Sequence, residues 1–81
     1  MKTIYADFNA RLDYEHVSLE TRGSQRDVIK HGGPQVLLGT RIIITDEDCL
    51  QAEAVVTMLD GELVAKVDWS TAEDIGECAD E

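Results

Sequence analysis

The sequence is short of basic residues, aromatic rings, cysteine and proline. Its 81 residues include seven Lys and Arg against seventeen Asp and Glu, which gives a net charge of −10. The few bases are scattered along the chain, whereas contacts with nucleic-acid phosphates need clustered Lys and Arg. The composition therefore argues against direct binding to nucleic acid or to an anionic membrane surface.

The scarcity of large rings constrains the core. Aromatic residues make up 5% of the chain and apolar residues 43%, so a folded core must be built mainly from Ile, Leu, Val and Ala. A chain of this length forms one domain and buries only somewhat over about 60% of its unfolded surface. We therefore expect no deep substrate cavity.

The two cysteines, Cys49 and Cys78, have no CxxC spacing and no neighbouring histidine. This pattern indicates neither a zinc site nor a disulfide framework, and it fits a reducing compartment. Residues 1–7 lack the apolar core of a signal sequence, and no window approaches the roughly 18 apolar residues of a membrane span. We therefore expect a cytoplasmic protein without membrane association.

The strongest structural pattern is in residues 38–69, which predict three consecutive antiparallel strands. The even positions of residues 50–58 and the odd positions of residues 63–69 are apolar, as in half-buried strands. Asp60-Gly61 is typical of a tight hairpin turn, and the acidic residues 46–48 predict a looser one. The pattern is that of a β-meander with one buried face.

The first part of the chain adds two strands and a helix. Residues 2–8 and 14–22 alternate in the same way and predict a hairpin. Ser24 followed by Asp27 resembles a capping box and predicts a helix of about two turns over residues 25–31, which a Gly-Gly-Pro sequence ends.

The end of the chain is strongly acidic. Residues 70–74 could cap one helical turn, and residues 76–81 are expected to form a mobile acidic tail after a single domain over residues 1–75. The whole pattern predicts a mainly β fold. It would be a small five-stranded antiparallel barrel or curled sheet, with one short helix between the second and third strands.

The order of these elements, with the strand start Leu38-Gly39-Thr40-Arg41-Ile42, resembles SH3-like or Tudor-like barrels over residues 1–69. The resemblance concerns architecture and identifies no family. Such barrels usually bind through clustered aromatic residues, and this chain has no evident aromatic cage. The resemblance therefore implies neither methyl-lysine nor polyproline recognition.

No group of residues forms a recognisable catalytic or metal-binding motif. The acids of residues 46–48 and Asp60 could bind a divalent cation, but they lack the spacing of a calcium loop. His16 fits a solvated strand face, and His31 fits a helix C-terminus better than an anion-binding nest. The acidic neighbours of Cys49 disfavour a thiolate. We therefore expect a protein that is not an enzyme and that uses no metal or cofactor.

Two surfaces are candidates for binding a partner. The predicted outer face of the meander has an apolar stripe between charges of both signs, which indicates a contact with another protein or with a second copy. Alternatively, the short helix or the acidic tail covers this stripe. Gln25 and Arg26 are not needed to start the helix and could also be presented to a partner. The stripe and its flanking charges are Arg41, Ile43, Glu53, Val55, Val64 and Lys66.

These features predict a small soluble protein-interaction module or accessory subunit without catalysis, which binds another protein through the outer face of its meander. The alternative is an acidic inhibitor or decoy that occupies the nucleic-acid site of a basic partner, and the net charge of −10 supports it. Salt separates the two hypotheses, because screening weakens an acidic decoy more than an apolar contact.

Overall fold

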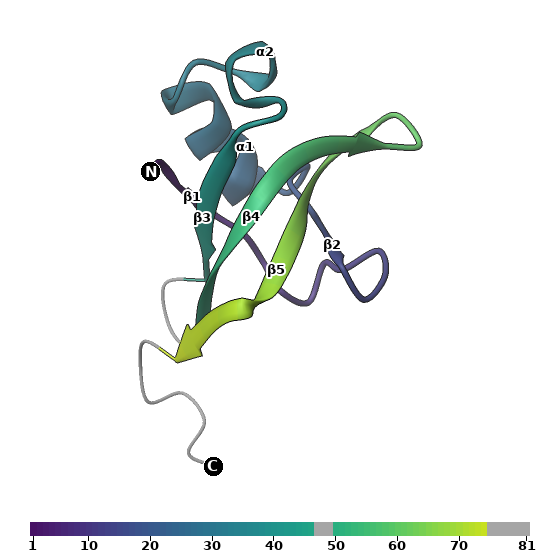
Figure 1. Ribbon diagram of the computed structural model, residues 1–81. Coiled ribbons are helices and arrows are strands. Elements are labelled where there is room, and N and C mark those ends of the chain that lie inside the picture. The colour runs from purple at the N-terminus through teal and green to yellow at the C-terminus, as the bar shows by residue number, and fades with distance from the viewer. Residues whose placement is uncertain (47–49, 75–81) are drawn as a thin grey trace.

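The computed structural model describes residues 1–46 and 50–74, and these form a mainly β fold with two short helices (Figure 1). The strands make one mixed sheet in the order β1-β3-β4-β5-β2, which curls into a half-barrel. The elements in chain order are β1 (Thr3–Tyr5), β2 (His16–Ser18), α1 (Arg22–Lys30), α2 (Pro34–Leu37), β3 (Arg41–Thr45), β4 (Leu50–Leu59) and β5 (Glu62–Asp74).

The predicted meander is confirmed. Strands β3, β4 and β5 pair antiparallel in succession. At the turn between β4 and β5, Asp60 has a φ of 52° and Gly61 a φ of 82°, and two successive positive φ angles are the geometry that a tight hairpin requires. The predicted inner positions Ala52, Ala54 and Val56 of β4 are buried, whereas Met58, predicted on the same face, is 48% exposed beside the hairpin turn. Alternation therefore identified the core face along most of β4 but not at its end.

The predicted hairpin between the first two strands is wrong. Strand β1 pairs parallel with β3 at one edge of the sheet, and β2 pairs antiparallel with β5 at the other edge. The observed register aligns Ile4 with Ile44 and Val17 with Ala65, and all four side chains are buried. Burial of one face specifies this long-range register more strongly than closeness in sequence does.

Helix α1 begins earlier than predicted, and the capping-box interpretation is wrong. Thr21 is the N-cap, and its side chain accepts a hydrogen bond from the Ser24 amide. Ser24 Oγ instead donates to the Tyr5 carbonyl oxygen at 2.7 Å, and the Tyr5 amide donates to Asp27 Oδ2 at 2.8 Å. Ser24 and Asp27 of α1 thus satisfy the outward-facing amide and carbonyl of Tyr5, which blocks further strand pairing at this end of the edge strand β1.

The predicted end of α1 is confirmed. His31 is the C-cap, and Gly32 and Gly33 follow with φ angles of 110° and 90°. The sequence did not predict α2, which has Pro34 in its first turn, where the missing proline amide costs no hydrogen bond. Leu37 of α2 is buried in the core.

Strand β5 continues through residues 70–74, where the sequence predicted a helical turn. The Thr71 hydroxyl donates to the Asp68 carbonyl oxygen at 2.7 Å and accepts from the Glu53 amide at 2.8 Å. The pairing of β4 with β5 shifts register between Gln51 and Glu53. The Thr71 hydroxyl, which the sequence suggested as part of a helix cap, instead binds the backbone at this β-bulge. Cys49, Cys78 and the predicted acidic tail lie outside the described residues.

One core holds the sheet and helices together. Its buried members come from all five strands, from both helices and from the connections next to them: Ile4, Ala6, Val17, Leu19, Val28, Leu37, Ile42, Ile44, Ala52, Ala54, Val56, Leu63, Ala65 and Val67. The core is aliphatic and has many small side chains, as the composition predicted. Within the described ranges, neither helix is long and apolar enough to cross a membrane.

Candidate functional site

The structure brings most of the predicted outer-face residues together in two neighbouring rows. Val55 of β4 lies opposite Arg41 of β3 and Lys66 of β5. In the next row, Glu53 lies opposite Ile43 on one side and Asp68 on the other. Cross-strand partners share a face of the sheet, so these side chains form one surface across β3, β4 and β5, which we call the meander face.

The prediction that Val64 belongs to the exposed stripe is wrong. Val64 is 0% exposed. Strand β2 pairs with β5 on the side away from β4, so Val64 lies between Thr57 of β4 and Ser18 of β2. Ser18 is itself buried, and its hydroxyl donates to Glu62. The apolar part of the meander face is therefore limited to Ile43 and Val55.

Arg41 is held in place by two carboxylates on the meander face. Its Nε donates to Glu53 Oε1 at 2.6 Å, and its Nη2 donates to Asp68 Oδ2 at 2.7 Å. These bonds raise the pKa of Arg41, whereas hydrogen bonds from the Ser70 hydroxyl and from Arg41 lower the pKa of Asp68. The three side chains are partly exposed, so the network adds little stability but fixes the position of the guanidinium.

A shallow hollow of about 330 Å³ opens on this face. Arg41 and Asp68 line it beside the aliphatic Val55 and the exposed Lys66. Lys66 also lies opposite His16 of β2, whose Nδ1 is 2.8 Å from Asp13 Oδ1. The hollow thus combines an aliphatic floor with charges of both signs, which suits a contact that is both polar and apolar.

Gln25 and Arg26 lie on α1 and do not join the meander face. The Gln25 side-chain amide donates to the Leu19 carbonyl oxygen at 2.8 Å, so it supports the connection before the helix. Arg26 is exposed and lies 3.5 Å from Asp27 Oδ1. Because α1 packs against β1, the two predicted binding surfaces are separate.

Sequence reasoning missed a cluster of three aromatic residues. The Trp69 ring centroid lies 6.0 Å from that of Phe8 and 6.2 Å from that of Tyr14, and both ring pairs are tilted. Trp69 Nε1 also donates to the Tyr14 carbonyl oxygen at 2.8 Å. The three rings come from segments far apart in sequence, so no local pattern could reveal them. Phe8 and Trp69 pack on the core, and the contacts hold the segment before β2 against β5.

The remaining candidate chemistry is mostly structural. Asp13 accepts hydrogen bonds from His16 and from the Glu15 amide, and these lower its pKa. The glycine amides after His31 donate to carbonyls of α1, which leaves them no role as an anion-binding nest. Among residues 1–46 and 50–74, no group of three or more His, Cys, Asp or Glu side chains is placed to hold a metal ion.

Comparison with protein-family models, with curated proteins and with solved structures found no match to this chain. A function for it must therefore be argued from its own residues.

Proposed function

We propose that this protein is a non-catalytic interaction module or accessory subunit that binds another protein through the meander face. The observation that carries the proposal is the hollow beside Val55, where Arg41 and Lys66 flank an aliphatic side chain on a part of the sheet that neither helix covers. A binding face needs both an apolar contact and charges that select the partner.

The position of the helices supports this choice of face. Helix α1 packs against β1, and Val28 of α1 and Leu37 of α2 are buried in the core on the other side of the sheet. The helices therefore do not cover β4 and β5 on the meander face (Figure 1). One of the two alternative explanations for the apolar stripe, coverage by the short helix, is thus removed.

The fixed guanidinium of Arg41 is also favourable for recognition. Arginine has a long flexible side chain, and ordering it on binding costs free energy. Here Glu53 and Asp68 already hold it on the unbound surface. A partner that contacts Arg41 therefore meets a preorganised group, with Val55 beside it as an apolar contact.

The non-catalytic role and a cytoplasmic location are part of the same proposal, and both rest on the sequence. The resemblance to SH3-like or Tudor-like barrels adds no function. Those barrels are antiparallel, whereas β1 pairs parallel with β3 here. If the partner is a second copy of this chain, the same face mediates self-association.

Three variants test the proposal with folding checked by circular dichroism. Val55→Thr keeps the branched shape but replaces a methyl with a hydroxyl, and Lys66→Glu reverses the charge beside it. Arg22→Glu makes the same charge change on the exposed start of α1 and serves as the control. We expect the first two to weaken partner capture by about ten-fold, or about 1.4 kcal/mol, and the control to leave it unchanged.

The salt dependence of capture distinguishes this function from an acidic decoy. Binding through Val55 and its flanking charges should persist at high salt, because burial of apolar surface is not screened. Capture that is lost at high salt, that Val55→Thr leaves unchanged and that Lys66→Glu and Arg22→Glu both strengthen would contradict the meander face and favour the decoy. Equal capture by wild type, Val55→Thr and Lys66→Glu would also contradict it.

A further inference from the structure

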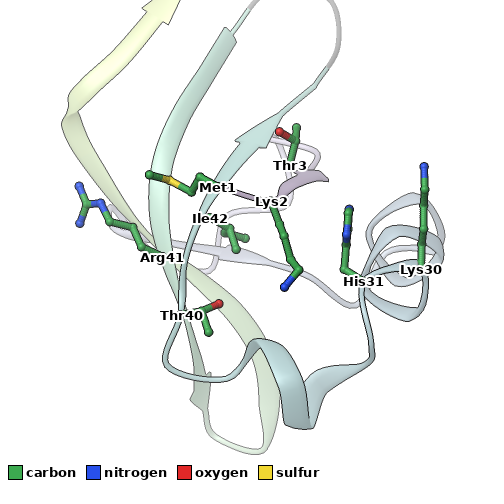
Figure 2. Close-up of a pocket in the computed structure, with 8 residues that line it drawn as sticks. All are labelled: Met1, Lys2, Thr3, Lys30, His31, Thr40, Arg41 and Ile42. Atoms are coloured by element: carbon green, nitrogen blue, oxygen red, sulfur yellow. The ribbon is translucent and has the colours of Figure 1, made fainter.

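A second hollow, distinct from the one on the meander face, lies where three segments meet (Figure 2). It has a volume of about 710 Å³ and is bounded by the start of β1, the start of β3 and the end of α1. Lys2 and Thr3 line it from one side, Lys30 and His31 from another, and Thr40 from a third. We call it the cationic hollow.

The charge of this hollow is opposite to that of the whole protein. The chain has seventeen acids and seven Lys and Arg, yet no Asp or Glu from the described part of the chain lines the hollow. In that same part, neither Lys2 nor Lys30 has an ion-pair partner within 4.0 Å. Within residues 1–46 and 50–74, an acidic protein thus has two lysines without ion-pair partners and a histidine around one depression.

Arg41 also lines this hollow but does not add to its free charge. Figure 2 shows its guanidinium pointing away from Lys2 and His31, and it is bound by Glu53 and Asp68. In the same view the side chains of Lys30 and His31 point in a common direction from the end of α1, and the Lys2 side chain points the opposite way. Both lysines are exposed and flexible, so a shared ligand requires their ammonium groups to turn toward it. The available positive charge therefore comes from Lys2 and from the end of α1.

The helix dipole explains only part of this arrangement. Positive side chains favour a helix C-terminus, which accounts for Lys30 and His31. However, the last carbonyls of α1 already accept hydrogen bonds from the amides of His31, Gly32 and Gly33. Lys2 comes from the strand side, 28 positions earlier than Lys30 in the sequence, and the dipole does not require it. The parallel pairing of β1 with β3 brings it to this place.

We infer that the cationic hollow binds a small polyvalent anion that carries phosphate, with Lys2 and Lys30 as its charged ligands. Lysine ammonium groups bind phosphate as point charges, and a hollow of this volume is within the range of small-molecule sites. Thr3 and His31 supply further polar groups at the wall. This site goes beyond the proposed protein contact, because the two hollows share only Arg41.

The test is a titration of isotope-labelled protein with pyrophosphate, followed by NMR at constant ionic strength. We expect saturable shifts of the backbone amides of Lys2, Thr3, Lys30 and His31, with no comparable shifts in a parallel titration with chloride. Shifts that grow without saturation, or that occur equally at the exposed Arg11 and Arg22, would overturn the site.

Matched variants make the test residue-specific. Lys2→Gln and Lys30→Gln should each weaken pyrophosphate binding by about five-fold, the factor that one unit-charge attraction at about 4 Å in water provides. Arg22→Gln removes the same charge from the opposite end of α1 and should leave binding unchanged. All three side chains are exposed, so the variants should retain the dispersed spectrum of the folded protein.

A phosphoserine peptide, titrated in the same way, identifies the source of the phosphate. If it produces the same shift map as pyrophosphate but binds more tightly, the natural ligand is a phosphorylated side chain of a partner. If it binds no more tightly, the ligand is a free anion. Affinity that is unchanged when Lys2 and Lys30 are both replaced would overturn the inference.

Discussion

Replacing Ser24 by alanine should destabilise the protein by more than any exposed substitution on the same helix. Ser24 is 0% exposed; its hydroxyl donates to the Tyr5 carbonyl at 2.7 Å and accepts from Thr21 Oγ1 at 2.9 Å. An unsatisfied buried polar group costs about 1–3 kcal/mol. Alanine regains about 0.5 kcal/mol of helix propensity, so we expect a net loss of about 1–2 kcal/mol.

The neighbouring Asp27 provides an independent check of this connection. Asp27 accepts a hydrogen bond from the Tyr5 amide at 2.8 Å, so Ser24 binds the carbonyl and Asp27 the amide of the same residue of β1. Once Ser24→Ala has loosened Tyr5, Asp27→Ala should cost less than it does alone. Coupling between residues in one network is about 0.5 kcal/mol or more.

Urea unfolding of the wild type, Ser24→Ala, Asp27→Ala and the double variant measures both the loss of stability and the coupling between the two residues. Arg22→Ala is the exposed control on α1. For a domain of this size, each kcal/mol also lowers the Tm by about 4–8 °C. A Ser24→Ala protein as stable as the Arg22→Ala control, or strict additivity of Ser24→Ala and Asp27→Ala, would contradict this joint role of Ser24 and Asp27.

Three further results are expected. Gly61→Ala should cost about 1 kcal/mol by denaturant unfolding, because φ is 82° and a Cβ would meet no atom within 4 Å, so the loss is conformational. Gly23→Ala should fail to give the stabilisation of about 1 kcal/mol usual in a helix, because its Cβ would lie 2.6 Å from Tyr5 Cδ2; a higher Tm would contradict this. The Asp68 carboxyl, which accepts from Ser70, should titrate by NMR below the ordinary pKa of about 3.9. Its stabilising contribution should therefore be present above about pH 3.9 and be lost as the pH falls through the lower folded pKa, and a midpoint at or above 3.9 would be inconsistent.

The inner face of the meander could be predicted because its signal is local. Alternation along residues 50–58 and 63–69 has the period of a strand, and the Asp60-Gly61 pair favours the positive φ angles observed there. The same alternation placed Arg41 and Val55 on one outer face, which the register supports. Strand periodicity alone was enough for these features.

The partners of the two outer strands could not be predicted in this way. Strands β1 and β2 are three residues each, and both pair with segments far away in sequence. The pairing of β2 with β5 buries Val64. The pairing of β1 with β3 places Lys2 at the same hollow as Lys30. The helix caps predicted from Ser24 and around Thr71 were wrong because of long-range contacts as well. Their hydroxyls bind backbone groups that are distant in sequence, although such hydroxyls often cap helices.

Site-specific photo-crosslinking in the source cells distinguishes binding through the meander face from binding elsewhere. A photo-reactive phenylalanine analogue would replace Thr57, which lies two positions beyond Val55 on the same face of β4, and in a second protein it would replace Arg22 on α1, with both proteins shown to fold. We expect a discrete crosslink to one protein, or to a second copy, from position 57 and none from position 22. No crosslink from position 57, or the same products from both positions, would contradict binding through the meander face.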